Sequence, residues 1–195
     1  PALFGIPYGA KDIFHTRGLP TEGGSRVLEG YISSENASVI DKLDSMGALL
    51  LGKLTTTEFA NLGTPPLTGN AWNPAHTPGG SSSGSAAAVG TRMALMALGT
   101  QTAGSLSRPA AFNGVTALKA TYGRISKAGV IPASWSLDHV GAFTHTVEDA
   151  VLVFNALSGP DHRDDTTQSL AYTSLKLREK HDYIVGIVDH PYYAS

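Results

Sequence analysis

The sequence contains no cysteine, and this absence excludes several kinds of chemistry. No disulfide, thiolate nucleophile or cysteine metal site can form anywhere in the 195 residues. Histidine occurs seven times, but the residues are scattered, and no two stand at the His-x3-His spacing of metal ligands on a helix. We therefore expect no bound metal.

Charge is also scarce, because charged residues make up 15% of the chain and the formal net charge is −2. Without a basic cluster there is no electrostatic reason to expect binding to nucleic acid or to an anionic membrane. No apolar run approaches the ~20 residues of a membrane span, and the first ten residues lack the basic and apolar regions of a signal peptide. We expect a cytoplasmic protein whose partner is a small molecule.

Apolar residues, by contrast, make up 42% of the chain, which is enough to form the core of one globular domain. Strand-length apolar runs alternate with helical patterns, and this alternation is typical of an α/β fold. A Thr146–Asp149 capping pair marks the start of one helix, which ends near Gly159. The expected elements are helices over 36–46, 85–93 and 146–159, buried strands over 48–54, 94–102 and 183–188, and a polar connection over 160–182.

The 22 glycines are concentrated in part in two loops that also carry serine. The first is "TPGGSSSGSAAAVG" at 77–90, and the second is "GTQTAGSLSRPAAFNG" at 99–114. A flexible linker is one interpretation of such a stretch, and a backbone loop that holds an anion or a nucleophile is the other. Since one helix and one strand separate the two loops, both can return to the same end of a sheet.

Two stretches of the sequence partly match known catalytic motifs, but the residues in and around each stretch argue against both motifs. "GALLLGKL" at 47–54 nearly matches a phosphate-binding loop, but Leu54 replaces the hydroxyl that binds the metal, and the apolar interior favours a core strand. Residues 80–84 match Gly-x-Ser-x-Gly with Ser82 in the middle and Asp138 and His139 downstream. That motif requires a strand leading into the turn, whereas the preceding segment contains two prolines and no apolar run. An α/β-hydrolase-type esterase that uses Ser82 remains a minor alternative.

Taken together, the two serine loops resemble the amidase signature family of serine amidases. The family's hallmark is a Gly-Gly-Ser-Ser-Gly-type loop followed at a fixed spacing by Gly-Thr-Asp-Thr-Gly-Gly-Ser-Ile-Arg. Upstream, "GIPYGAKDIF" is similar to the lysine motif of the family, and downstream, "SLDHVGAFTHTVEDA" is similar to its Ser-Leu-Asp-x-x-Gly segment. The resemblance covers residues 5–159, with four motifs in the family order.

Carried over by position, the resemblance implies that Ser105 is the nucleophile, Ser81 a bridging serine after a cis peptide bond, and Lys11 the base. Residue chemistry agrees, because a serine hydroxyl needs a group that takes its proton, and a desolvated neutral lysine can do so. A hydroxyl both donates and accepts, so Ser81 can relay the proton. The oxyanion hole would consist of backbone N–H groups of the second loop, at Thr102, Ala103, Gly104 and Ser105.

Three residues of the second loop depart from the family pattern. Gln101 replaces an Asp, Ala103 replaces a Gly, and Ser107 stands where the family usually has Arg. Arg108 follows immediately and can supply the missing cation from the next position. Together with Ser82, the residues Gln101 and Arg108 are expected to support the site, and none of the departures touches the three proposed catalytic residues.

The resemblance implies an incomplete amidase domain over 1–195, with a mixed central sheet flanked by helices on both faces. Family enzymes are commonly more than twice this long, so we expect another polypeptide segment, or self-association, to complete the domain. The expected activity is hydrolysis of a small-molecule amide to an acid plus ammonia or an amine through an acyl-enzyme, with no cofactor. Esterase activity or ammonia supply for an amidotransferase are related possibilities, and a noncatalytic fragment is the alternative.

Overall fold

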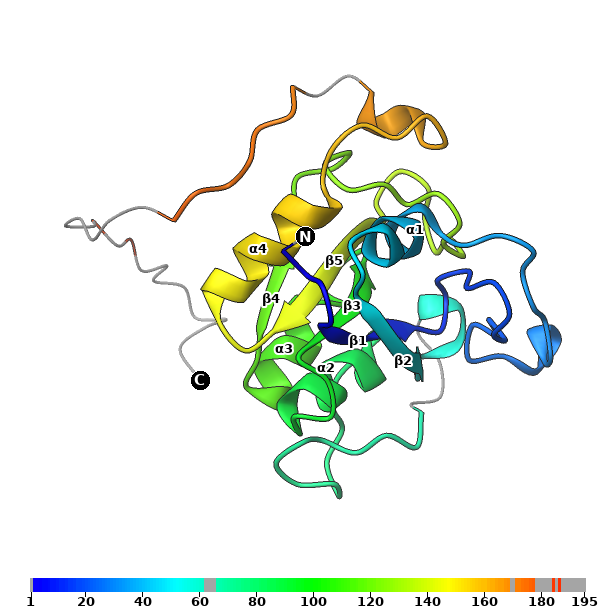
Figure 1. Cartoon of the computed structure of the whole chain (residues 1–195). Helices are drawn as coiled ribbons and strands as arrows, with labels where there is room; N and C mark the ends of the chain where they lie inside the picture. Colours follow the sequence, from blue (N-terminus) through cyan, green and yellow to red (C-terminus); the bar gives the residue numbers. More distant parts are fainter. Residues whose placement is uncertain (1, 62–65, 169–170, 178–183, 185, 187–195) are drawn as a thin grey trace.

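A five-stranded mixed sheet forms the centre of the computed structural model, which describes residues 2–61, 66–168, 171–177, 184 and 186 (Figure 1). The strand order is β2-β1-β3-β5-β4. Strand β1, next to the edge strand β2, pairs in parallel with β2 and with the central strand β3, whereas β5 runs antiparallel to both β3 and β4. The bounds of the strands are β1 Pro7–Lys11, β2 Leu49–Leu54, β3 Met96–Gln101, β4 Thr116–Lys119 and β5 His139–Thr144.

Helices cover both faces of this sheet, as the sequence predicts. On strand β3, Met96 and Leu98 pack into a core with α1 and α4, and Ala97, which points the opposite way, packs into a second core with α2 and α3. The helices are α1 Ser38–Ser45, α2 Ser83–Gly90, α3 Ser107–Asn113 and α4 Val147–Leu157, with short 3-10 turns at Arg26–Leu28, Glu58–Ala60 and Asp165–Thr167.

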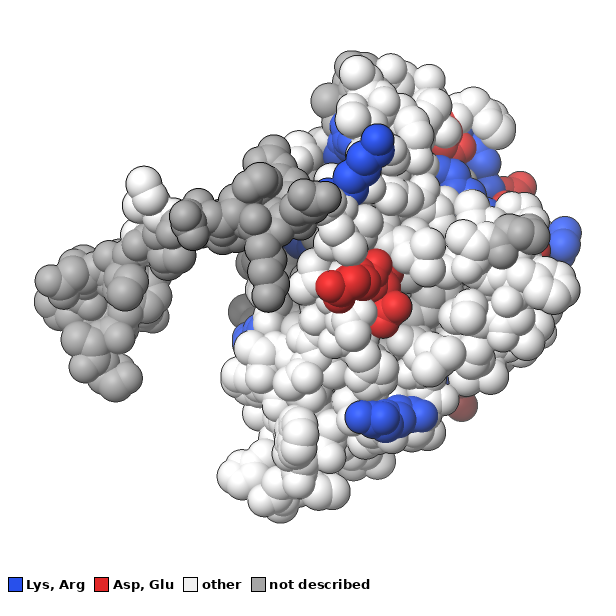
Figure 2. All heavy atoms as spheres, turned by 60° about the vertical axis from the view of Figure 1, so that its left-hand side comes forward, with Lys and Arg blue, Asp and Glu red and all other residues white. Residues whose placement is uncertain are grey.

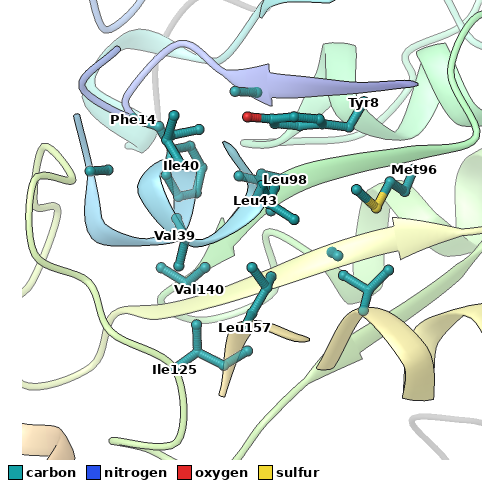
Figure 3. Packing of buried hydrophobic residues seen from close by; sticks show 14 of the residues in the cluster. Tyr8, Phe14, Val39, Ile40, Leu43, Met96, Leu98, Ile125, Val140 and Leu157 are labelled. Atoms are coloured by element: carbon teal, nitrogen blue, oxygen red, sulfur yellow. The ribbon is translucent and has the colours of Figure 1, made fainter. Parts of the chain in front are cut away.

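The larger core lies between the sheet and the helices α1 and α4 (Figure 3). Five of its large side chains, Tyr8, Phe14, Leu43, Leu98 and Leu157, are at most 1% exposed. Burying each such side chain stabilises the fold by roughly 1.5–3 kcal/mol relative to leaving it in water. Residues of β1 and β3 pack into this core, and the candidate site forms where these two strands end.

The smaller core lies between the sheet and the helices α2 and α3, where Phe143 and Leu106 pack against small side chains of these elements. Helix α2 has the sequence SGSAAAVG, and all its residues except Gly90 are buried. At Gly84 an added Cβ would lie 2.6 Å from the backbone nitrogen of Thr55, so the helix packs too closely for a side chain there. The Ser85 hydroxyl donates to the Leu98 carbonyl at 2.8 Å. The first serine loop therefore leads into a tightly packed helix, and the linker interpretation is wrong.

Strand β2 corrects one sequence prediction. Its apolar run predicts a buried strand, but Leu49 is 56% exposed and Leu51 is 60% exposed. The reason is the position of β2 at the edge of the sheet, where β1 is its neighbour on one side. An apolar run alone cannot separate a central strand from an edge strand.

The carboxyl-terminal part of the chain begins with a predicted helix. Helix α4 starts at the Thr146 cap, whose hydroxyl accepts a hydrogen bond from the Asp149 N–H at 3.1 Å. Beyond it, the described part of the polar connection 160–182 contains one 3-10 turn and otherwise no regular structure. Within this connection the Leu175 N–H donates to the Asn155 side chain on α4 at 2.7 Å. The strand predicted over 183–188 lies almost wholly outside the described residues.

Most of the face shown in Figure 2 is uncharged, and acidic and basic side chains lie next to each other at its upper right. In the part of the chain that the structure describes, no helix is long and apolar enough to cross a membrane. Among the same residues no group of three or more His, Asp or Glu side chains is arranged to hold a metal ion.

Candidate active site

Lys11 lies at the carboxyl end of β1, inside the protein. Because β1 and β3 are parallel and Ala10 pairs with Leu98, Lys11 is brought beside the last residues of β3. Its Nζ donates to the Thr100 hydroxyl at 2.9 Å and to the Ser81 hydroxyl at 2.7 Å. The Lys11 side chain is 0% exposed. The predicted base is therefore a buried amine with two hydroxyl partners, one of them the predicted bridging serine.

Burial changes the acid–base chemistry of Lys11. Removal from water disfavours the ammonium and lowers the pKa of Lys11 from 10.5 to about 7, while the carboxylate of Asp138 acts in the opposite direction. Near neutral pH about half of the Lys11 side chains are therefore uncharged and able to accept a proton. Asp12, the adjacent carboxylate in the sequence, forms an ion pair with Lys53 at 2.8 Å instead. Lys11 is thus not the counter-ion of Asp12.

Ser81 lies in the loop before α2, and the peptide bond between Gly80 and Ser81 is cis, as the family resemblance implies. Several hydrogen bonds hold this loop. The Arg108 guanidinium donates to the Gly80 carbonyl, and the Thr57 N–H donates to the Ser81 carbonyl at 3.2 Å. On the far side, the Asn113 amide donates to the Pro78 carbonyl at 2.8 Å. The Ser81 side chain is therefore fixed between Lys11 and an open pocket.

Ser105 follows β3 in the turn that leads into α3, and it lines the same pocket as Ser81. The pocket has a volume of about 310 Å³. In the described chain the Ser105 hydroxyl makes no hydrogen bond to another protein group. The fold thus brings Ser81 and Ser105, which are 24 positions apart in the sequence, to the wall of one pocket. The other loop residues at its wall are Thr102, Ala103, Gly104 and Arg108.

The backbone of this turn presents donors to the pocket. Within the described residues, the N–H groups of Ala103, Gly104 and Ser105 donate to no protein acceptor. An added Cβ on Gly104 would have only the Arg108 Cβ near it, at 4.0 Å, so the backbone is open on that side. Such unpaired N–H groups beside a hydroxyl are the arrangement that stabilises an oxyanion.

Gln101 has a defined part in this turn. Its Oε1 accepts hydrogen bonds from the Leu106 N–H at 2.8 Å and the Ser107 N–H at 2.9 Å. Only the carbonyl oxygen of the amide is used, and a carboxylate of the same reach would accept the same bonds. The replacement of the family's Asp therefore keeps the support of the turn and removes a negative charge from beside the pocket.

The sequence analysis did not identify the contacts of two residues at the site. Thr100 is the second partner of Lys11, and Asp138 acts on the charge of Lys11 while it accepts a 2.5 Å hydrogen bond from the Thr102 hydroxyl. Thr100 and Asp138 both lie within sequence motifs quoted above, but those motifs do not indicate what the two side chains contact. Their contacts depend on pairing between distant strands, which no local pattern reveals.

The alternative nucleophile Ser82 is not accessible. It is 0% exposed, its hydroxyl donates to the Thr100 carbonyl at 3.1 Å, and it accepts from the Thr100 N–H at 3.3 Å. Ser82 therefore joins the start of α2 to β3, and its hydroxyl cannot reach a substrate. The esterase alternative based on Ser82 is wrong, and so is a phosphate loop at 47–54, because those residues include strand β2.

Comparison with known proteins gives the family. The chain matches the amidase family over residues 1–195. It belongs to the amidase family. One curated relative, a subunit of the glutamyl-tRNA(Gln) amidotransferase of Anaeromyxobacter sp. (strain K), is 43% identical over 193 residues, which cover 96% of this chain and 37% of that protein.

Solved amidase structures share the fold. An amidase family protein from Bacillus anthracis str. Ames superposes with a TM-score of 0.84 at 35% identity, covering 89% of this chain and 37% of the other. The native peptide amidase from Stenotrophomonas maltophilia gives a TM-score of 0.81 at 37% identity, covering 87% and 37%. The chain thus spans a little over a third of the length of these relatives, and its α/β sheet is the corresponding part of the amidase fold.

Proposed function

We propose that this chain carries the catalytic centre of an amidase that hydrolyses the C–N bond of an amide through an acyl-enzyme on Ser105. One observation supports this above the others: a fully buried lysine with a pKa near neutrality is hydrogen-bonded to Ser81 at the wall of the pocket that contains Ser105. A surface lysine would not be able to act as a base at pH 7.

In the proposed reaction the Ser105 oxygen attacks the amide carbonyl carbon and transfers its proton to Ser81, which passes its own proton to neutral Lys11. The N–H groups of residues 102–105 stabilise the oxyanion. The proton on Lys11 returns through Ser81 to the amide nitrogen, and the C–N bond breaks to release ammonia or an amine. Water then attacks the acyl-enzyme, with the same groups moving its proton, and frees the acid and the Ser105 hydroxyl.

An active-site serine probe tests this proposal. A fluorophosphonate should label the 195-residue chain on Ser105, as located by peptide mass spectrometry, and Ser105→Ala should abolish labelling. Ser107→Ala is the matched control, because Ser107 is an exposed serine two residues after Ser105, at the start of α3, and has no part in the proposed chemistry. If the folded wild-type chain takes no label, the noncatalytic alternative holds instead.

Ammonia supply for an amidotransferase is the second candidate function. It is favoured by the 43% identity to a subunit of a glutamyl-tRNA(Gln) amidotransferase. The discriminating measurement is ammonia release from glutamine compared with release from simple aliphatic amides under the same conditions. A marked preference for glutamine supports this candidate, and equal or better turnover of simple amides supports a general amidase.

A completing polypeptide is part of the proposal. The chain covers 37% of the amidotransferase protein, and Leu49 and Leu51 on the edge strand β2 expose apolar surface that a further segment or a second copy would bury. Light scattering of the purified chain measures self-association directly. If a monomeric chain is labelled faster when a polypeptide that corresponds to the rest of a full-length relative is supplied, that polypeptide is the completing segment.

A further inference from the structure

Asp138 lies immediately before β5, and the sheet places it opposite the turn that leads to the proposed nucleophile. The last pair of the antiparallel ladder between β3 and β5 joins Gln101 to His139. One residue further on each side are Thr102 and Asp138, and residues that face each other in this way have adjacent side chains. The Thr102 hydroxyl accordingly donates to Oδ1 of Asp138 at 2.5 Å. One oxygen of the carboxylate is therefore bound to the oxyanion turn, residues 102–105.

The second oxygen of Asp138 holds a different part of the pocket wall. Oδ2 accepts from the N–H groups of Ala133 and Ser134, both at 2.8 Å. Ala133 and Thr102 both line the pocket of Ser105, whereas Asp138 is not among the described residues that line it. One carboxylate thus joins two separate parts of the wall without touching the space where a substrate would lie.

The charge of Asp138 also acts on the proposed base. Thr100 accepts from the Lys11 Nζ at 2.9 Å, and Thr100 precedes Thr102 by two positions. Side chains two positions apart along an extended strand point to the same face. The negative charge on Asp138 favours the ammonium form of Lys11 and so opposes the effect of burial on the pKa of Lys11.

Other charged groups near Lys11 are bonded to different partners. Asp12, the next residue in the chain, forms an ion pair with Lys53 on β2 at 2.8 Å. Arg108, on α3, donates from its guanidinium to the Gly80 carbonyl at 2.7 Å.

Two titratable groups lie beside Asp138 itself. Lys127 lines a hollow together with Asp138, but its ammonium donates to the Trp135 carbonyl at 2.8 Å. His139 lines the same hollow, and its Nδ1 is 2.6 Å from the Leu137 carbonyl. Asp138 takes part in none of the ion pairs found among the described residues. Its carboxylate therefore has hydrogen-bond donors but no cationic partner that would cancel its charge.

We propose that Asp138 is a positioning residue for the reaction at Ser105: its carboxylate fixes the oxyanion turn against the wall at Ala133, and its negative charge favours transfer of the proton to Lys11. This inference rests on the proposed amidase function. A misplaced oxyanion turn stabilises the developing charge less well, and a base without a neighbouring negative charge takes up a proton less readily.

Two substitutions separate the charge of Asp138 from its hydrogen bonds. Asp138→Asn removes the charge, yet its oxygen can accept from the two N–H groups and its amide can donate to the Thr102 hydroxyl. Thr102→Val removes the hydroxyl and leaves the carboxylate charged. The readout is the second-order rate constant for fluorophosphonate labelling of Ser105, measured at pH 6 and at pH 8.

The ratio of the two rate constants reports the charge. With a pKa of about 7 for Lys11, the rate in the wild type at pH 6 should be about one-tenth of the rate at pH 8. Asp138→Asn should raise this ratio at least about twofold, because Lys11 becomes neutral at a lower pH. Thr102→Val should lower both rates about tenfold and leave the ratio unchanged.

The matched control is Asp164→Asn. Asp164 also accepts from a threonine hydroxyl, that of Thr166 at 2.6 Å, and from a backbone N–H, that of Lys127 at 2.8 Å, but it lies outside the pocket of Ser105. Asp164→Asn should keep the wild-type rates and ratio. His139→Gln should also keep the ratio, which matters because histidine changes its charge between pH 5 and 8.

A purely structural role for Asp138 gives a different result. In that case Asp138→Asn lowers both rates by the same factor and the ratio stays at one-tenth, which overturns the proposal. An equal rise of the ratio in His139→Gln, or labelling of Thr102→Val at the wild-type rate, overturns it too. If Asp138→Asn does not fold, Thr102→Val decides: lower rates at an unchanged ratio support the proposal, and wild-type rates overturn it.

A failure of the amidase function itself is distinguishable, because the wild-type chain then takes no label on Ser105. The protonation of Lys11 can be followed without any reaction by NMR of its ε-methylene group, assigned by the loss of that signal in Lys11→Met. A lower titration midpoint in Asp138→Asn than in the wild type supports the proposed effect of the charge. An equal or higher midpoint overturns it.

Discussion

The neutral fraction of Lys11 should control the rate at which Ser105 reacts. With a pKa of about 7, Lys11 is neutral in roughly one-tenth of molecules at pH 6, one-half at pH 7 and nine-tenths at pH 8. The rate of fluorophosphonate labelling should therefore rise about tenfold from pH 6 to pH 8 and level off above pH 8. A lysine with an ordinary pKa would give a hundredfold rise over the same interval and a further tenfold rise to pH 9.

The assay is the second-order rate constant for labelling from pH 6 to pH 10. Lys11→Arg and Lys11→Met should both be inactive at every pH, because neither side chain can accept a proton. Lys119→Arg is the matched surface control and should follow the wild-type curve. A rate that keeps rising tenfold per pH unit through pH 9, or substantial labelling of Lys11→Arg, would refute the role of Lys11 as the base.

The same pKa change has a consequence for stability that does not depend on catalysis. The folded state lowers the pKa of Lys11, so between pH 7 and 10.5 the unfolded chain binds a proton that the folded chain does not. The contribution of Lys11 to stability is therefore largest above pH 10.5 and is lost as the pH falls toward 7. Relative to Lys11→Met, the wild type should gain about 2 kcal/mol in unfolding free energy from pH 7 to pH 9. Denaturant titrations at the two pH values measure this difference, and a pH-independent difference would contradict the lowered pKa.

Three further changes test the site and the fold separately. Ser81→Ala should reduce labelling of Ser105 by orders of magnitude because it removes the hydroxyl bonded to Lys11; full labelling rules out the relay. Thr146→Ala should lower the unfolding free energy by about 1 kcal/mol through loss of the α4 cap, without changing the labelling rate. Leu98→Ala should cost about 2–5 kcal/mol, because Leu98 is 1% exposed in the larger core; a loss below 1 kcal/mol in denaturant titration contradicts that packing.

Local patterns in the sequence determined the kinds of element and where several of them begin. The Thr146–Asp149 pair marks the start of α4, and the strand predicted over 94–102 contains β3 Met96–Gln101. Periodicity and capping are properties of neighbouring residues, so they can be read without the fold. The order of the four motifs likewise indicated the family and singled out Lys11, Ser81 and Ser105 as a set.

Only the tertiary structure decided which groups meet. That Lys11 contacts Thr100 follows from the parallel pairing of β1 with β3, and its low pKa follows from complete burial. The exposure of Leu51 follows from the edge position of β2, and the contact of Arg108 with the Gly80 carbonyl follows from the packing of the turn before α3 against the cis loop. Burial and pairing between distant segments are properties of the whole chain, and the chemistry of this pocket depends on both.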